Sequence, residues 1–359
     1  MRSLLRLAVV LLSLLLLQPA TTAHAFGGPG HRTIGAIADI RLHGTTAQKH
    51  VRALIAKGDP DNGVSAIDCA KNPRVCSLEK YAVWADCAKG STYCPTGLGG
   101  NAWFDDEMKA FGQKFTDFSS DVPNPFHHAF HYADIPIQEQ GYRETSHGAN
   151  RNDAVHVLAE CIEFLRDPKG SPNPRGFSER EALFLIAHIV GDLHQPLHVG
   201  AVYVAANREF VNPNTVMEKF EETQGGNLLM LGSTNLHSYW DRTTVEDVMT
   251  KQIADPKSRR PALLASLLAK RKEHWETNGD VRTWPTQWAD EALVLARDAY
   301  RIRLEAPQTV VDPNSEKSRL QWRIQNADEY DRNGARDVVE RQLIKAGYRL
   351  AEVLKRIWP

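Results

Sequence analysis

The sequence predicts an all-α protein, a single mainly helical domain, and three observations support this. Apolar residues recur at steps of three and four residues over much of the chain, as in helices that bury one face. Alternating apolar and polar residues, which are typical of half-buried strands, are scarce, and no segment is repeated. No stretch shows the change in composition that marks a linker between domains. We therefore expect one helical domain.

Six segments carry the helical period, and they cover residues 33–42, 153–165, 179–194, 261–269, 288–304 and 334–358. The third begins at a capping box, Ser178 with Glu181, in which each side chain accepts a hydrogen bond from the other residue's backbone N–H. We expect this helix to end at Pro196, because proline cannot continue a helix.

The first 25 residues have the features of a signal peptide. Arg2 and Arg6 precede an apolar run over residues 7–17, and the small residues of Ala-His-Ala at 23–25 fit a cleavage site. The run is too short for a comfortable membrane span, although a retained anchor is the alternative. We expect residues 1–25 to be removed, leaving residues 26–359 as a secreted or periplasmic chain that begins at Phe26.

The charge balance limits the classes of partner. The formal net charge is −1, whereas a broad electrostatic binder of nucleic acid is normally basic. An enzyme that holds one or two nucleotides is not excluded by this balance. No long apolar segment follows residue 25, so we expect no stable membrane insertion. We also expect a monomer.

Five cysteines in an exported chain indicate disulfides. Two couples have the same spacing, Cys69 with Cys76 and Cys87 with Cys94. Pairing within each couple is the preferred connectivity, although four cysteines permit three arrangements. Cys161 lies in a helical segment and is expected to be a buried free thiol.

Histidine and aspartate recur at helical spacing in two distant segments. Residues 187–199 read A-H-I-V-G-D-L-H-Q-P-L-H-V, so His188 and Asp192 share one helix face. His237 and Asp241 repeat the spacing in N-L-H-S-Y-W-D. An imidazole beside a carboxylate suits zinc or a similar divalent ion. A buried histidine with its carboxylate partner is the alternative interpretation for either pair alone.

His198, in the first of these two segments, is a further candidate ligand, and other segments add His31, Asp86 and His131. We expect these residues to assemble with the two pairs in a helical interior. Taken singly, Asp86 could cap a helix and His131 could pack in the core. Helical bundles can assemble histidine–carboxylate sites for several metal ions. Zinc sites with open positions for water are hydrolytic.

At these residues the chain resembles the zinc-dependent single-strand nucleases and 3'-nucleotidases of fungi, plants and bacteria. The matching segments span essentially the whole mature chain: F-G-G-P-G-H, W-A-D-C-A-K, F-H-Y-A-D, A-H-I-V-G-D-L-H-Q-P-L-H-V-G, G-G-N, N-L-H-x-x-W-D and A-G-Y-R-L-A. The strings G-D-L-H-Q-P-L-H and N-L-H-x-x-W-D are highly specific. The resemblance implies a single helical domain of the trinuclear-zinc nuclease and phospholipase C type.

The resemblance also implies three zinc ions per chain. The first would take Asp86, His131, His188 and Asp192, and the second would take His198, His237 and Asp241. The third would take His31, Asp192 as a bridge, and the amine and carbonyl oxygen of Phe26. The family usually has Trp at this first position. Because the ligands are backbone atoms, Phe26 is expected to preserve the metal site.

Further roles follow from the resemblance. Asp86 would orient a metal-activated water, and Lys89 would neutralise charge on the phosphate. Tyr132 would stack on a base and Asp134 would accept hydrogen bonds from its edge, which favours single strands. The expected substrates are single-stranded DNA, RNA and 3'-nucleotides, and the strands would yield 5'-phosphates. Taken alone, Lys89 could be a solvated loop lysine.

Several other features are left outside the site. His127 and His128 are interpreted as surface residues, and His194 as structural. Residues 202–223 are either a lid or a surface loop near the cleft. The alternatives for the function are a trinuclear-zinc phospholipase C, which would favour Glu in place of Asp241, and a zinc-binding protein without catalytic turnover.

Overall fold

The computed structural model describes most of the chain from Phe26 onward. The described residues are 26–56, 69, 71, 73–90, 102–120, 123–271, 273, 275–311 and 318–359. The predicted signal peptide, residues 1–25, lies outside them.

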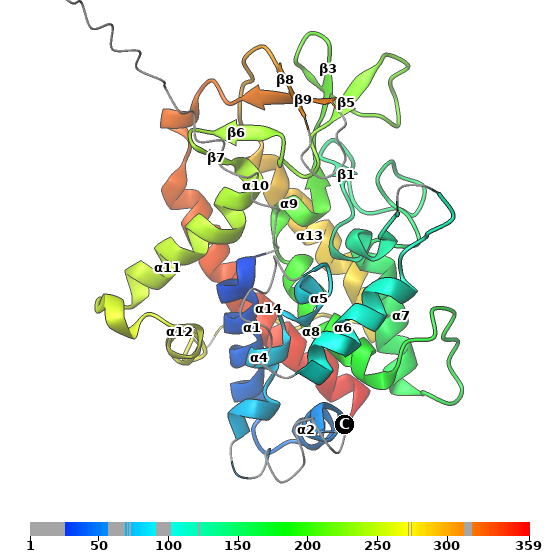
Figure 1. The fold of residues 1–359 in the computed structure, drawn as a ribbon. Helices are drawn as coiled ribbons and strands as arrows, with labels where there is room; N and C mark the ends of the chain where they lie inside the picture. Colours follow the sequence, from blue (N-terminus) through cyan, green and yellow to red (C-terminus); the bar gives the residue numbers. More distant parts are fainter. Residues whose placement is uncertain are drawn as a thin grey trace, which may run out of the picture.

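Long helices make up the centre of the molecule. Helix α8 (Glu179–Asp192) packs against α1 (Gly27–Arg41), α7 (Ala154–Arg166) and α14 (Arg332–Ile357). Helix α13 (Trp284–Ala299) lies against α7. In Figure 1 the blue α1 and the red α14 lie side by side next to the green α8. Every residue of α8 from Ala182 to Asp192 is buried, so this helix crosses the core.

Shorter helices surround this centre. They are α2 (Thr46–Ala56), α4 (Leu78–Tyr81), α5 (Trp84–Cys87), α6 (Ala102–Lys114), α9 (Pro196–Val199), α10 (Leu236–Ser238), α11 (Thr244–Gln252) and α12 (Pro261–Leu268). Short 3-10 segments are η1 (Pro73–Cys76), η2 (Phe126–His131), η4 (Pro256–Ser258), η5 (Val281–Thr283) and η6 (Ala327–Glu329), and η3 (Tyr239–Thr243) is a π-helical turn. The predicted all-α class is confirmed as a mainly helical domain.

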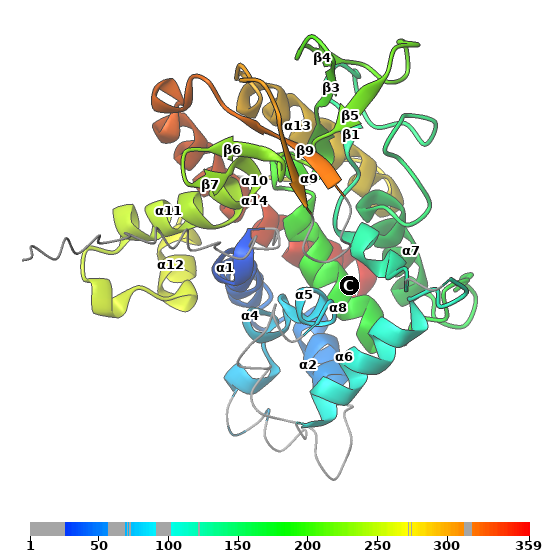
Figure 2. The same cartoon turned by 45° about the horizontal axis from the view of Figure 1, so that its top comes forward.

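Small sheets cover one end of the helices (Figure 2). Strand β1 (Ile135–Pro136) pairs in parallel with β2 (Gly200–Ala201). The second sheet has the order β4-β3-β5, with β3 (Tyr203–Ala205), β4 (Phe210–Val211) and β5 (Phe220–Glu222). The third has the order β7-β6-β9-β8, with β6 (Leu229–Leu231), β7 (Thr234–Asn235), β8 (Gln308–Val311) and β9 (Ser318–Arg323). Residues 202–223 therefore contain a small three-stranded sheet, whose strands are joined by loops.

The six predicted helices correspond to α1, α7, α8, α12, α13 and α14. The capping box of Ser178 and Glu181 is present at the start of α8. The segment predicted over 288–304 is a helix over Trp284–Ala299 instead. It ends early because the chain turns at Tyr300 and then pairs with β9, where Glu305 donates to the carbonyl of Arg323.

The predicted end of the third helix at Pro196 is wrong. Helix α8 ends at Asp192, and Pro196 is the first residue of a new helix, α9. Proline suits the first position of a helix, because its missing N–H would have no partner there. The side chain of Gln195 caps α9 by accepting a hydrogen bond from Leu197 N. His198 therefore lies on a different helix from His188 and Asp192.

The cysteine predictions are confirmed where the described residues test them. Cys69 and Cys76 form a disulfide. Cys161 is a buried free thiol on α7. Cys87 is disulfide-bonded, but its predicted partner Cys94 lies outside the described residues.

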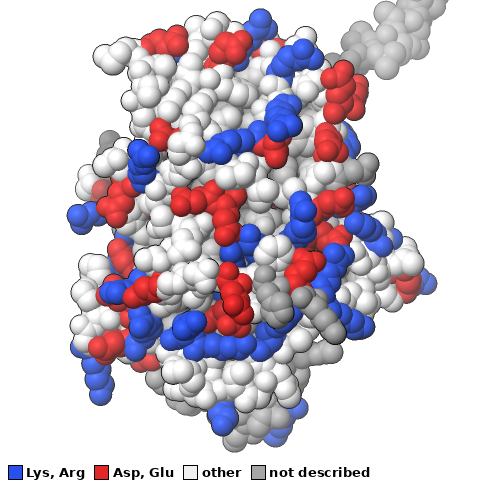
Figure 3. Space-filling view, turned by 180° about the vertical axis from the view of Figure 1, so that it is seen from behind, with Lys and Arg blue, Asp and Glu red and all other residues white. Residues whose placement is uncertain are grey.

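Charges of both signs are interspersed over the face shown in Figure 3, in agreement with the small net charge. Within the described part of the chain, no helix is both long enough and apolar enough to cross a membrane.

Candidate metal centre

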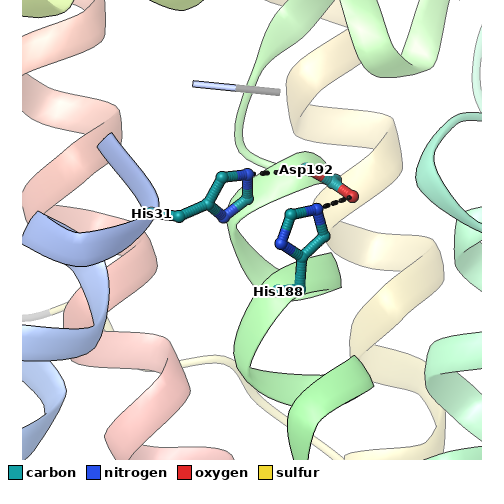
Figure 4. Close-up of side chains that lie close together, drawn as sticks. All are labelled: His31, His188 and Asp192. Carbon is teal, nitrogen blue, oxygen red and sulfur yellow. Dashed lines mark ion pairs between the residues drawn. The ribbon is translucent and has the colours of Figure 1, made fainter. Parts of the chain in front are cut away.

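The first group of possible metal ligands joins α1 to α8. His188 and Asp192 lie one turn apart on α8, with Nε2 of His188 3.4 Å from Oδ2 of Asp192. His31 of α1 lies beside His188, with Nε2 3.3 Å from Oδ1 of Asp192 (Figure 4). A Cβ atom on Gly191 would lie 2.8 Å from Nδ1 of His31, so glycine there permits the close approach. These three residues could hold one metal ion.

The second group adds residues from α5 and η2. Oδ1 of Asp86 lies 3.6 Å from Nδ1 of His131 and 3.6 Å from Nε2 of His188. His131 Nδ1 is also 3.2 Å from Oδ2 of Asp192. Asp86, His131 and His188 could together hold a metal ion, so His188 belongs to two groups. The proximity of Asp192 fits the four-residue set that the resemblance implies.

The third group consists of His198 on α9, His237 on α10 and Asp241 in η3. Nε2 of His237 lies 3.0 Å from Nε2 of His198 and 3.2 Å from Oδ2 of Asp241. The predicted spacing of His237 and Asp241 therefore brings both side chains to one point, although the helix widens into a π-helical turn there.

Backbone contacts connect these segments. The parallel pair β1–β2 aligns Ile135 with Gly200, and Ala133 N donates to the carbonyl of His198 at 2.8 Å. The residues that follow His131 therefore run beside those that follow His198. This pairing sets the distance between the second and third groups.

Each group contains at least one histidine that is oriented by a backbone carbonyl. Nδ1 of His188 is 2.6 Å from Ala82 O, Nδ1 of His198 is 2.6 Å from His131 O, and Nδ1 of His237 is 2.7 Å from Gly225 O. Such contacts fix the ring so that Nε2 faces the group, as is usual for metal-binding histidines. Gly225 has a φ of +58°, and a Cβ there would lie 2.7 Å from Leu197 O. Glycine is therefore required where this carbonyl meets His237.

Burial makes the charged carboxylates of these groups energetically unfavourable unless a cation or a hydrogen-bond donor compensates them. All eight residues are at most 4% exposed. Among the described residues, no donor hydrogen-bonds either carboxylate oxygen of Asp192 or Oδ2 of Asp241. Buried carboxylate oxygens normally have partners, so these exceptions need an explanation. Divalent cations would supply the missing partner, and the mixture of imidazole and carboxylate is typical of zinc.

The pKa values of three of the histidines agree with this interpretation. Burial lowers the pKa of His131 and His198 well below its usual value and that of His188 to about 4, so these rings stay neutral and can ligate metal. Burial raises the pKa of Asp192 to about 8, although nearby His188 and Lys89 oppose the shift. Burial acts to lower the pKa of His237, but Asp241 outweighs it and the pKa is raised.

Phe26 lies at the start of α1, which also carries His31. It is fully buried and has left-handed backbone angles, with φ 41° and ψ 9°. A Cβ on the next residue, Gly27, would lie 3.3 Å from the carbonyl oxygen of Asp241. The start of α1 is thus packed beside the third group, while its predicted role as a zinc ligand stays a prediction.

The predicted substrate residues lie around the groups. Lys89 follows α5 and its Nζ is 3.0 Å from Oδ1 of Asp86. Tyr132 and Asp134 follow His131, and Tyr132 is 38% exposed. Asp134 has a φ of +51°, and its carbonyl accepts a hydrogen bond from the Tyr203 hydroxyl on β3. Burial, opposed by nearby His237, raises the pKa of the Asp134 carboxyl to about 7.

Two histidines outside the groups behave differently from each other. The interpretation of His127 as a surface residue is wrong, because its ring is 3% exposed and lies edge-on to Phe111 at 5.8 Å. The short η2 segment turns it inward. His194 is structural, as expected: Nδ1 is 2.7 Å from Val190 O and Nε2 is 3.2 Å from Nη1 of Arg349.

The sequence did not indicate that Gln195 contacts the third group. Its Nε2 atom donates to Oδ1 of Asp241 at 2.6 Å. The only local signal is the Gln-Pro pair, which is compatible with a helix start but says nothing about Asp241.

Comparison with known proteins agrees with this site. The S1/P1 nuclease family model matches residues 26–359. Endonuclease 4 of Arabidopsis thaliana is 25% identical over 248 residues, covering 64% of this chain and 69% of that protein. Endonuclease 2 of Arabidopsis thaliana is 22% identical over 371 residues, covering 99% of this chain and 98% of that protein. Nuclease S1 of Aspergillus oryzae is 26% identical over 251 residues, covering 68% and 75% respectively. With three buried histidine–aspartate groups and a family match over nearly its whole length, this chain belongs to the S1/P1 nuclease family of hydrolases.

Proposed function

We propose that residues 26–359 form an exported, monomeric, zinc-dependent nuclease and 3'-nucleotidase. It hydrolyses single-stranded DNA and RNA to products with a 5'-phosphate. The observation that carries this proposal is the convergence of three buried histidine–aspartate groups, two of which share His188. A protein that only stores zinc has no need for groups joined in this way.

The residues present fit three zinc ions. Asp86, His131, His188 and Asp192 would hold one ion, and His198, His237 and Asp241 would hold another. His31, Asp192 and the backbone of Phe26 would hold the remaining ion. Zinc ions bound there would supply Lewis-acid chemistry, lowering the pKa of a water molecule and neutralising charge on a phosphate.

Asp86 and Lys89 act on the phosphate side of the site. The carboxylate of Asp86 orients the attacking water as well as holding metal, and the Nζ atom of Lys89 lies 3.0 Å from it. In that position the ammonium group neutralises charge that develops on the phosphate oxygens. Lysine provides a point charge without the two-pronged geometry of arginine.

Tyr132 and Asp134 select unstacked bases. Tyr132 is partly exposed directly after His131, so its ring is available for stacking on a base next to the metal groups. Asp134 accepts hydrogen bonds from the base edge. Stacking tolerates any base, but it requires a base outside a duplex, so it favours single strands.

Export completes the site in this proposal. Removal of residues 1–25 frees the amine of Phe26, and only a free, deprotonated amine binds zinc well. The Cys69–Cys76 disulfide is typical of exported proteins.

A four-substrate assay tests the function. Mature zinc-loaded protein is incubated with heat-denatured DNA, RNA, 3'-AMP and phosphatidylcholine. Hydrolysis of the nucleotide substrates supports the proposal, and hydrolysis of phosphatidylcholine alone supports a trinuclear-zinc phospholipase C instead. Zinc binding without hydrolysis of any substrate would identify a binding protein. Metal analysis of the same sample should give three zinc ions per chain, and one zinc ion per chain would contradict the site.

A further inference from the structure

Gln195 makes a buried contact with one of the proposed metal ligands. The side chain is fully buried. Its amide Nε2 donates to Oδ1 of Asp241 at 2.6 Å, and its Oε1 accepts a hydrogen bond from Leu197 N at 2.5 Å. Both ends of the amide are therefore used, and neither is available for solvent or substrate.

The backbone of Gln195 connects two other ligands. Its N–H donates to the carbonyl of Asp192 at 2.9 Å, and its carbonyl accepts from the N–H of His198 at 3.0 Å. The residue thus spans the break between α8 and α9, with Asp192 on one side and His198 on the other. Through its side chain it also reaches Asp241 in η3.

This contact determines which oxygen of Asp241 faces the metal group. An aspartate carboxylate turns readily about its last bond, because that torsion is broad. With Oδ1 held by Gln195, Oδ2 lies 3.2 Å from Nε2 of His237 and has no hydrogen-bond donor among the described residues. The other oxygen, Oδ1, is 3.8 Å from Nε2 of His198. Asp241 is therefore presented to the third group through one oriented oxygen.

The chemistry at this position favours an amide. A carboxylate in place of the Gln195 amide would face Asp241 with a like charge and without the N–H donor. The neutral Gln195 amide donates a hydrogen bond that can orient Asp241, and its N–H group does not itself bind a cation. Removal of a contact of this kind commonly weakens metal binding by about 10–100-fold.

We propose that Gln195 is a positioning residue, which holds Asp241 so that Oδ2 ligates the metal bound with His198 and His237. The inference rests on the proposed zinc site. It concerns affinity at one of the three groups, whereas the substrate assay concerns catalysis.

The test compares Gln195→Met with Gln342→Met. Gln342 is a matched control, because it is also buried and donates through Nε2 at 2.9 Å, but to the carbonyl of His194 rather than to a ligand. Zinc affinities of the apoproteins are measured by competition with a chromogenic chelator, and thermal unfolding is recorded in excess chelator. We expect Gln195→Met to bind one of its three zinc ions about 10–100-fold more weakly, while Gln342→Met keeps all three affinities.

Gln195→Glu provides a second measurement if the methionine variant does not fold. It keeps the acceptor for Leu197 N and nearly the same shape, and it too should lose affinity for one zinc ion. Wild-type affinity in a folded variant of either kind overturns the inference. Equal weakening of all three zinc ions in Gln195→Met and Gln342→Met also overturns it, because that result indicates general destabilisation. If the wild type binds three zinc ions but has no nuclease activity, that result contradicts the proposed function and leaves the inference about Gln195 intact.

Discussion

Nε2 of His31 lies 3.3 Å from Oδ1 of Asp192, while Oδ2 of the same carboxylate lies 3.2 Å from Nδ1 of His131. The two oxygens of Asp192 thus face different histidines. His31 and His188 are also stacked, with ring centroids 3.8 Å apart. Asp192 therefore lies between the first and second groups.

Asp192→Asn should remove two of three zinc ions. An amide presents one oxygen and no charge, so it cannot bridge two cations in the same way. We expect metal analysis to give about one zinc per chain and kcat/KM to fall by at least about 100-fold, the loss typical of removing a major electrostatic contact. Asp153→Asn is a control, because Asp153 is equally buried but caps α7. Three zinc ions in Asp192→Asn would refute the bridging role.

An extra residue before Phe26 should lower activity sharply. Phe26 is fully buried at the start of α1, so a preceding residue would convert the amine to an amide in a packed region. An amide nitrogen is a poor zinc ligand, and one zinc ion should be lost with the activity. The comparison is between proteins that begin at Phe26 and at an added glycine, both assayed on denatured DNA. Unchanged activity and zinc content would remove Phe26 from the proposed ligands.

Lys89→Met should reduce kcat/KM by about 10²–10³-fold, because a charge-stabilising donor beside the phosphate is lost. Lys89→Arg should recover part of the rate, since it retains the charge with a different shape. Zinc content should stay at three in both variants. Lys114→Met serves as the control, because Lys114 hydrogen-bonds to Gly176 O and does not approach Asp86 in this structure. A wild-type rate for Lys89→Met would mean that Lys89 pairs with Asp86 but takes no part in the reaction.

Tyr132→Ala should weaken substrate binding while Tyr132→Phe keeps most of it. A stacked base contributes about 1–3 kcal/mol, so we expect the KM for short single-stranded oligonucleotides to rise by about 5–150-fold in the alanine variant. The phenylalanine variant preserves the ring. Steady-state kinetics on the three proteins will distinguish these effects. Equal KM values for all three would mean that Tyr132 does not contact the base.

Asp39, which does not belong to the metal groups, should make the free energy of unfolding depend on pH. It accepts hydrogen bonds from Leu78 N and Glu79 N, and burial raises its pKa from 3.8 to about 7 in the folded protein. The folded state therefore binds this proton more tightly than the unfolded state. The stability that the protonated Asp39 contributes is present below pH 4 and is lost as the pH rises towards 7.

Asp39→Asn removes this titration. The free energy of unfolding of the variant, relative to wild type, should rise between pH 4 and pH 7 by on the order of a few kcal/mol. Urea unfolding with excess chelator, repeated across this pH range, measures the difference. Parallel pH profiles for wild type and Asp39→Asn would rule out the assignment.

Local patterns predicted much of the fold. The capping box at Ser178 and the buried helix that follows depend on neighbouring residues, so the sequence indicated them directly. The end of α13 was misjudged because the pairing of Glu305 with Arg323 is not visible in local periodicity. Likewise, Pro196 is compatible with either the end or the start of a helix, and the core packing of α8 and α9 decides between them.

The order of residues along the chain sets which side chains are available and how they are spaced, including His188 with Asp192 and His237 with Asp241. The resemblance adds the family and an expected assignment to three zinc ions. The meeting of His31, Asp86 and His131 with α8, and the contact of Gln195 with Asp241, appear only in the folded molecule. These contacts join segments far apart in the chain, and their distances depend on helix packing and on the β1–β2 pair. Helical spacing sets geometry within a turn, whereas packing sets geometry between helices.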